Sequence, residues 1–233
     1  MTLPLLISVP HAGRRVPPEV GNRCLLSETQ LLRDGDEGAE EIYAVADGVA
    51  AYVTTEVARA IVDLNRAPDD IRPDGVVKTE TCFEEPVYEE PLDDATIEAL
   101  LRHHYHPYHQ RLSEAARPPV RLGIDCHTML AVGPPIGPGA GLARPRICLG
   151  NAEGTCPELW LESLARCLRA EFGDDVALNE PFRGGYIIRS HAHELPWVQL
   201  EMSRAPFASP REKRRRLLVA LRRWCGECLP RRD

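Results

Sequence analysis

The sequence predicts an α/β protein in which helices cover both faces of a central β-sheet. Along most of the chain, short apolar or alternating runs typical of strands are followed by segments with helical periodicity. Of the 233 residues, 43% are hydrophobic, which is enough to build a full core in one large domain. We therefore expect residues 1–233 to form a single domain with α/β/α layers.

The strands are predicted from two patterns. Residues 3–9 are almost continuously apolar, as in a parallel strand buried on both faces. Other runs alternate between apolar and polar residues, as in strands with one buried face. In chain order, the remaining predicted strands cover residues 51–55, 58–64, 121–128, 146–149, 176–178 and 197–202.

The helices are predicted from periodicity and capping residues. Ser27 should cap a helix, because Gln30 follows three positions later as in a capping box. Asp93 or Asp94 should cap a long helix that extends to residue 116 and is kinked at Pro107. The other predicted helices cover residues 42–50, 157–172 and 217–224.

Two long segments lack the pattern of regular structure. Residues 67–92 are rich in Pro, Asp and Glu and poor in apolar residues, so we expect a long loop or lid. Residues 133–141 contain so many Gly and Pro residues that no helix or strand is expected. The second loop directly follows the central strand, so it should border any site at the end of that strand.

Composition and charge exclude several classes of protein. A formal net charge of −7 disfavours nucleic acid as a partner, and we assign the basic run at 211–216 to a solvated helix face. No run reaches the length of a membrane span and the N-terminus lacks a signal-peptide pattern, so a cytoplasmic protein without a membrane partner is expected. The eight cysteines are scattered and should be free thiols, and Cys225 and Cys228 form only a weak C-x-x-C signal.

Polar residues with catalytic chemistry stand where predicted strands end. Asp125 and His127 are two positions apart on the central strand, so their side chains share one face. His11 follows the first strand, and Asn65 and Arg66 end the run at 58–64. Strand ends of an open α/β sheet commonly form its site, so we expect these side chains to meet at one sheet edge.

These residue types suit a metal-dependent hydrolase. Two imidazoles and one carboxylate, with a fourth position left for water, form a catalytic zinc site. Arginines hold anionic substrates by their carboxylates through paired hydrogen bonds. The carboxylates and arginines near strand ends are Asp36, Asp125, Glu201, Arg66, Arg183, Arg189 and Arg204.

Six short motifs follow one another along the chain at residues 8–13, 62–68, 107–109, 125–128, 182–187 and 199–201. In this order they resemble the N-formylglutamate amidohydrolase (N-formylglutamate deformylase) family. The resemblance covers about residues 3–204. That family is similar to the zinc carboxypeptidase and aspartoacylase group, so the resemblance implies a three-layer fold with a mixed, mostly parallel sheet and a Zn²⁺ ion.

The resemblance also implies roles for individual residues. It makes His11 and His127 zinc ligands and places Asp34 and Asp36 where the family has its acidic ligand; we choose Asp36. The related aspartoacylase group has a glutamate three residues after its first histidine, whereas Arg14 stands here. The remaining implied roles are general base for Glu201, an alternative proton-transfer group for His109, support of the metal ligands for Asp125, and substrate binding for Asn65, Arg66, Arg183 and Arg189.

The expected reaction is hydrolysis of a small anionic N-acyl amino acid, with N-formyl-L-glutamate as the first substrate. We expect His191 and His193, which lie in a polar loop, not to bind the metal. Two alternatives stay open: a binding or regulatory protein on this fold that has lost catalysis, and a metallopeptidase that acts on short peptides.

Overall fold

The computed structural model describes residues 2–229, so both ends of the predicted 1–233 domain lie outside the described residues. Six strands form one sheet in the order β2-β1-β3-β6-β4-β5. The first four strands in this order are parallel, β4 is antiparallel to β6, and β5 is parallel to β4. The strands are β1 (Leu3–Val9), β2 (Val49–Thr54), β3 (Leu122–Met129), β4 (Ile147–Gly150), β5 (Val176–Leu178) and β6 (Trp197–Ser203).

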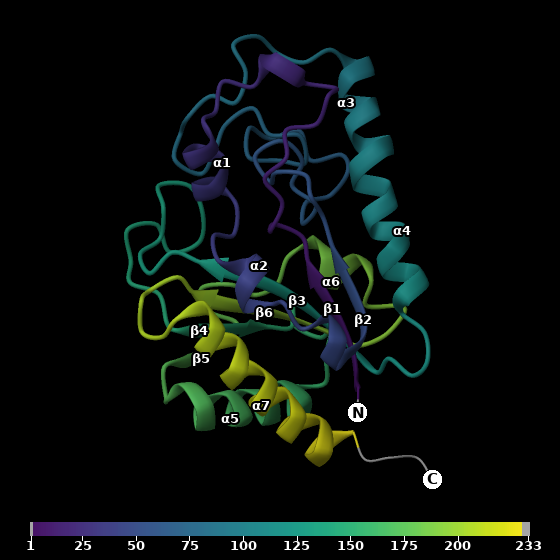
Figure 1. Ribbon diagram of the computed structural model, residues 1–233, viewed down its shortest axis with the longest axis vertical. Coiled ribbons are helices and arrows are strands. Elements are labelled where there is room, and N and C mark those ends of the chain that lie inside the picture. The colour runs from purple at the N-terminus through teal and green to yellow at the C-terminus, as the bar shows by residue number, and fades with distance from the viewer. Residues whose placement is uncertain (1, 230–233) are drawn as a thin grey trace.

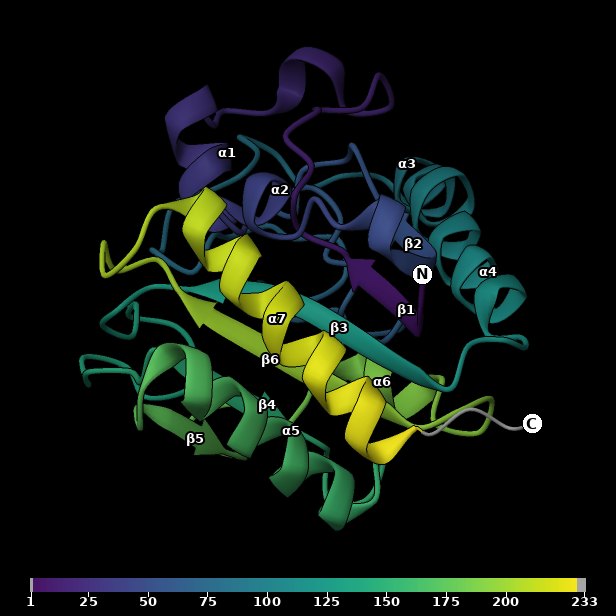
Figure 2. The same ribbon diagram turned by 60° about the horizontal axis from the view of Figure 1, so that its bottom comes forward.

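Helices lie on both sides of this sheet (Figure 1). One apolar core joins the sheet to α2 (Ala39–Ile42), α5 (Glu158–Phe172) and α7 (Pro210–Cys228), and α5 and α7 cross in front of the strands in Figure 2. The core on the other face includes α4 (His106–Ala115) and α6 (Tyr186–Ser190). This arrangement confirms the predicted α/β class with a mixed, mostly parallel sheet.

Several predicted elements are present with their expected signals. Helix α1 (Glu28–Asp34) begins with the capping box of Ser27 and Gln30. The long predicted helix begins at its cap Asp93 as α3 (Asp94–Leu100), but a π-helical turn at Leu101–Tyr105 separates it from α4. Because the ring of Pro107 would clash with the carbonyl four residues earlier, a wider turn just before it is physically reasonable.

Two predictions are wrong. The helix predicted at 42–50 is not formed. Helix α2 already ends at Ile42, and the chain passes through a short 3₁₀ turn at Ala46–Gly48 into β2. The predicted strand at 58–64 consists of turns with a single bridge between Val62 and Val77. All apolar side chains of this second segment are buried, so its pattern reported burial and not an extended conformation.

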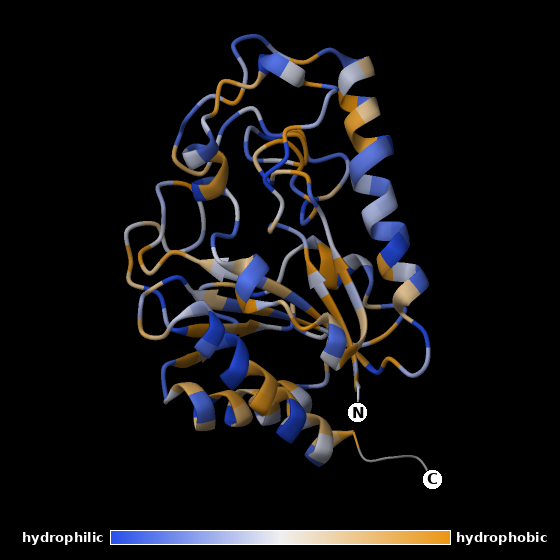
Figure 3. Cartoon of the chain, viewed as in Figure 1, coloured by the Kyte–Doolittle hydropathy of each residue, from blue (hydrophilic) through white to orange (hydrophobic). Residues whose placement is uncertain are grey.

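The predictions for the two loops, the cysteines and the basic run largely agree with the structure. Residues 67–92 and 133–141 contain no helix or strand, and all eight cysteines are free. The basic run opens α7, whose exposed turns are blue in Figure 3, but Lys213 is buried and donates to the Ser203 carbonyl. Among the described helices, none combines the length and apolar character that crossing a bilayer requires.

Gly123 offers a test of the sheet packing. It pairs with Trp197 across β3 and β6, and a Cβ atom at this position would lie 2.3 Å from the Trp197 ring. Gly123→Ala should therefore lower the free energy of unfolding by about 1–3 kcal/mol, the usual cost of overpacking a core. Urea unfolding of the purified variant measures this change.

The matched control is Gly226→Ala in α7, where an added Cβ meets no atom within 4 Å. Alanine is a better helix former than glycine, so this variant should be at least as stable as the parent. Equal effects of the two substitutions would contradict the packing argument.

Candidate metal centre and active site

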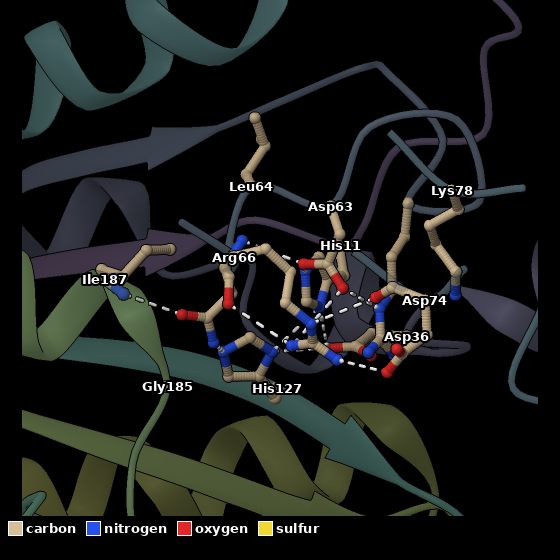
Figure 4. A network of polar contacts seen from close by, with 12 residues as sticks. His11, Asp36, Asp63, Leu64, Arg66, Asp74, Lys78, His127, Gly185 and Ile187 are labelled. Atoms are coloured by element: carbon tan, nitrogen blue, oxygen red, sulfur yellow. Dashed lines mark hydrogen bonds and ion pairs between the residues drawn. The ribbon is translucent and has the colours of Figure 1, made fainter. Parts of the chain in front are cut away.

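His11 and His127 meet because their strands are parallel neighbours. β1 pairs with β3, and His11 follows the end of β1 while His127 lies near the end of β3. The Nδ1 atoms of the two rings are 3.1 Å apart, and both side chains are buried (Figure 4). The sheet edge predicted from the strand ends thus brings these histidines together.

A buried carboxylate orients each ring. His11 Nε2 lies 2.8 Å from Asp63 Oδ1, and His127 Nε2 lies 2.8 Å from Asp125 Oδ2. An ionised carboxylate only accepts hydrogen bonds, so each Nε2 carries a proton and donates. In the neutral form of each ring, the lone pair is then on Nδ1, where the two rings face each other. Carboxylates in this position are the usual support of metal-binding histidines.

Asp36 adds a carboxylate to this point. Its Oδ2 is 3.1 Å from His127 Nδ1 and 3.7 Å from His11 Nδ1, and it accepts a hydrogen bond from the Thr128 backbone N–H. The backbone N–H of Asp36 donates to the His11 carbonyl, which fixes the loop beside that ring. One ligand atom from each of His11, Asp36 and His127 lies within 4.8 Å of the others, as a bound metal ion requires.

The electrostatics of the cluster favour positive charge. Burial opposes charge on the His127 ring, but the neighbouring Asp125 and Asp36 carboxylates outweigh it and raise the pKa of His127 well above its usual value. Burial also opposes the charge of Asp36, yet the two imidazoles hold the pKa of this carboxyl below its usual range. A divalent cation held by the same atoms would satisfy this charge balance, so the donor set fits a metal.

Asp34, the other candidate acid, has a different role. Both of its carboxylate oxygens accept hydrogen bonds from Lys78 Nζ at 2.8 Å, and Oδ1 also accepts from the Cys82 backbone N–H. Asp34 lies in the last turn of α1, whereas Asp36 follows Gly35 beyond the helix end. The structure therefore brings Asp36, and not Asp34, to the two histidines.

Asp63 received no role from the sequence but is central to the geometry. It is fully buried, and besides His11 it accepts hydrogen bonds from Arg59 Nε at 3.1 Å and from the Asn65 backbone N–H at 2.9 Å. Burial opposes its charge, but Arg66, His11 and Arg59 hold the pKa of the carboxyl well below its usual range. The sequence feature that could have indicated this role is the acidic residue within the largely apolar run at 58–64.

Glu201 lies on β6 directly opposite His127 in the β3–β6 register. It is buried and accepts a hydrogen bond from Gln199 Nε2 at 2.8 Å, so the two side chains share a face as their alternation predicts. Burial raises the pKa of the Glu201 carboxyl to about 6. A carboxylate with such a pKa is suited to accept a proton near neutral pH.

These residues open onto a cavity of about 420 Å³. Its wall contains His11, Asp36, His127, Glu201, Asn65 and several basic side chains. Two contacts position Asn65. Its amide packs so closely against Gly185 that a Cβ at that position would lie 2.2 Å away, and its Oδ1 accepts a hydrogen bond from the Ile187 N–H. The basic residues of the wall are Arg33, Arg59, Arg66, Lys78, Arg144, Arg183 and Arg204.

The four predicted substrate-binding residues are placed differently. Asn65 and Arg66 line the cavity, and Arg66 donates to the Asp74 carbonyl. Arg183 also lines it, but its side chain is mostly exposed and is paired with Glu153 at 2.9 Å. Arg189 is exposed on α6 and is not part of the cavity wall, because Ile187 and Ile188 occupy the inner face of that short helix.

His109 is not among the residues that line the cavity. Its Nε2 is 3.0 Å from the Leu64 carbonyl, and its Nδ1 is 2.9 Å from His191 Nε2. Burial and the neighbouring His191 lower the pKa of His109 to about 4. With both nitrogens engaged, His109 supports the segment that carries Asn65, and its role in proton transfer stays a prediction.

His191 and His193 lie outside the group of His11, Asp36 and His127. His191 Nδ1 is 3.0 Å from Glu194 Oε2, while the His193 side chain is 76% exposed. That neither contributes to a metal site stays a prediction.

A family model described as N-formylglutamate amidohydrolase matches residues 3–208 of the chain. The N-formylglutamate deformylase of Pseudomonas aeruginosa is 32% identical over 260 aligned residues, which cover 97% of this chain and 95% of the relative. The enzyme of the same name from Pseudomonas putida is 32% identical over 228 residues, which cover 90% of this chain and 84% of the relative.

Two solved structures share the fold. The N-formylglutamate amidohydrolase of Ralstonia eutropha superimposes with a TM-score of 0.77 at 22% identity, covering 96% of this chain and 93% of that one. The gene product Atu2144 of Agrobacterium tumefaciens superimposes with a TM-score of 0.71 at 20% identity, covering 97% of this chain and 89% of that one.

The Asp63–His11 contact predicts a metal-affinity change. Asp63→Asn keeps the size of the side chain but removes the charge that favours a protonated Nε2. We expect zinc affinity to fall by about 10- to 100-fold, the usual effect of removing a support of a metal-ligating histidine. Competition with a chromophoric chelator measures the affinity.

The matched control is Glu194→Gln, which changes another carboxylate paired with a histidine, His191, outside the cluster. Zinc affinity should be unchanged in this variant. Equal losses in Asp63→Asn and Glu194→Gln would show that the effect does not come from the His11 contact.

Proposed function

The chain belongs to the N-formylglutamate amidohydrolase family, and from this we propose that it is a zinc-dependent hydrolase of small N-acyl amino acids, with N-formyl-L-glutamate as the first substrate. The observation that carries the proposal is the convergence of His11, Asp36 and His127 at a cavity with basic walls. The relatives named as N-formylglutamate deformylases support the choice of substrate.

The residues that would hold the zinc ion are His11 and His127, each through Nδ1, and Asp36 through a carboxylate oxygen. When bound, zinc supplies Lewis acidity, which makes water more acidic and polarises a carbonyl group. Asp63 and Asp125 keep both imidazoles in the tautomer and orientation that such binding needs.

Glu201 is the general base of the proposed reaction. Its buried carboxylate accepts a proton from the attacking water, whose oxygen forms the new bond to the formyl carbon. The same carboxyl then returns the proton to the nitrogen as the C–N bond breaks, which releases formate and the free amine of glutamate. Glu201 is buried and lines the cavity in which the substrate would bind, so its carboxylate would face the reacting amide.

Asn65 and Arg66 would hold the α-carboxylate of the substrate. The planar guanidinium of Arg66 is oriented by the Asp74 carbonyl and by Asp63, whose carboxylate lies 3.7 Å away. A fixed guanidinium can pair with two carboxylate oxygens, which an ammonium group cannot do. The ordering of the α-carboxylate would place the neighbouring amide beside the metal ligands.

The central test combines metal content with activity. The purified protein should contain about one zinc per chain, since three protein ligands form a site of the catalytic kind, and it should release formate from N-formyl-L-glutamate. Removal of zinc with a chelator should abolish formate release, and added zinc should restore it. Full activity in the metal-free protein would contradict zinc dependence, and no formate release from the zinc-loaded protein would contradict the substrate.

Glu201→Gln tests the base directly. Glutamine keeps the shape of the side chain but cannot accept the proton, so kcat should fall by about 10²- to 10⁴-fold, the usual contribution of a positioned proton-transfer group. Zinc content should stay as in the parent, because Glu201 is not among the three ligands. Metal analysis and steady-state kinetics on the same preparation measure both quantities.

Glu227→Gln on α7 is the control, because it makes the same change at an exposed ion pair with Arg223 far along the chain from the cavity wall. It should leave both kcat and zinc content unaltered. Loss of zinc in Glu201→Gln would make Glu201 a ligand and remove it from the role of base.

A further inference from the structure

Arg144 differs from the other basic residues of the cavity wall. Within the described chain, every other one has a carboxylate within 4.0 Å, whereas Arg144 has none. The pairs are Arg33 with Glu85, Arg59 with Asp63, Arg66 with Asp63 and Asp74, Lys78 with Asp34, Arg183 with Glu153, and Arg204 with Asp36. The cavity therefore has one guanidinium that forms no ion pair with a described carboxylate.

The guanidinium of Arg144 is also short of hydrogen-bond acceptors. Its Nη2 donates to the Pro138 carbonyl at 2.6 Å, but its Nε is buried and has no partner among the described residues. Its central carbon lies 4.9 Å from the centroid of the Phe182 ring, which covers one face of the group. A buried N–H without an acceptor costs free energy, so the site is better satisfied when an anion is bound.

Backbone contacts hold Arg144 at the wall of the cavity that also contains His11 and His127. The Arg144 N–H donates to the Ala131 carbonyl at 2.8 Å, and Val132 forms a bridge with Ala143. Ala131 comes two residues after the end of β3, the strand that carries His127. The loop that follows β3 thus starts and ends at the cavity, and Arg144 at its end places a guanidinium in the cavity wall.

We propose that Arg144 binds the side-chain carboxylate of the substrate and makes the enzyme selective for N-acyl derivatives of acidic amino acids. This inference rests on the proposed function, in which Arg66 binds the α-carboxylate and the amide lies at the metal ligands. A dicarboxylate substrate then has one carboxylate left over, and the cavity has one unpaired guanidinium. A planar guanidinium suits a carboxylate because it can form two parallel hydrogen bonds.

The test compares two substrates that differ in one charge. N-formyl-L-glutamine has nearly the shape of N-formyl-L-glutamate but a neutral side chain. In Arg144→Met, kcat/KM for the glutamate derivative should fall by about 10- to 100-fold, since a hydrogen bond to a charged group contributes about 1.5–3 kcal/mol. The value for the glutamine derivative should barely change, so the preference for the acidic substrate is lost.

Arg146→Met is the matched control, since Arg146 lies two residues further along and also contacts a phenylalanine ring and a backbone carbonyl. Its guanidinium lies 5.2 Å from the Phe207 ring and donates to the Phe172 carbonyl, but it is outside the cavity wall. It should retain the parent preference. If Arg144→Met lowers kcat/KM for both substrates equally, or lowers neither, the proposal is overturned.

Arg144→Lys covers the case in which the methionine variant does not fold. Lysine keeps the charge but not the fork, so kcat/KM for the glutamate derivative should be reduced while the glutamine derivative is unaffected. A lysine variant with the parent preference would show that bidentate pairing by Arg144 does not set it.

A binding measurement separates this inference from the proposed function. If the zinc-loaded parent hydrolyses neither substrate, the proposed function fails, and calorimetry with glutarate and with pentanoate tests Arg144 alone. The parent should bind the dicarboxylate glutarate more tightly than the monocarboxylate, and Arg144→Met should remove that difference. A difference that survives in the variant would overturn the role of Arg144.

Discussion

The geometry of the site depends on two buried carboxylates, Asp63 and Asp125, each hydrogen-bonded to the Nε2 of a histidine. Because a carboxylate only accepts hydrogen bonds, these contacts turn the Nδ1 atoms of His11 and His127 toward Asp36. Burying such charges is costly unless they are paired. The surrounding contacts can be understood as compensation: Asp125 also accepts from Ser8, and Asp63 accepts from Arg59.

The same requirement explains why the long loop at 67–92 remains ordered without helices or strands. It supplies Lys78, which is 1% exposed and neutralises Asp34, and Asp74, whose carbonyl orients Arg66. In this part of the cavity wall, buried polar contacts hold the loop in place, whereas apolar packing holds the helices against the sheet. Such pairs give weak net stability, but losing one partner leaves an uncompensated buried charge, which makes the arrangement of the wall specific.

Many features of the fold and the site were predictable because they depend on local pattern. Period-two alternation placed Gln199 and Glu201 on one face of β6, and the capping box marked the start of α1. Histidines at the ends of two apolar strands meet because parallel neighbouring strands have their carboxyl ends at one edge. The same reasoning failed at 58–64, where a buried run is folded into turns, since apolar pattern reports burial more directly than conformation.

The sequence by itself thus determined the α/β class, all six strands near their observed positions with one further strand wrongly predicted at 58–64, and the residue types gathered at the site. Only the tertiary structure decided which charged groups pair: Asp63 with His11 across 52 residues of chain, Asp34 with Lys78 across 44, and Arg144 with no carboxylate among the described residues. It also left Arg189 exposed and placed His109 against the Leu64 carbonyl, outside the cavity wall. Periodicity is a property of neighbouring residues, whereas the partner of a buried charge is set by the packing of segments distant in the chain.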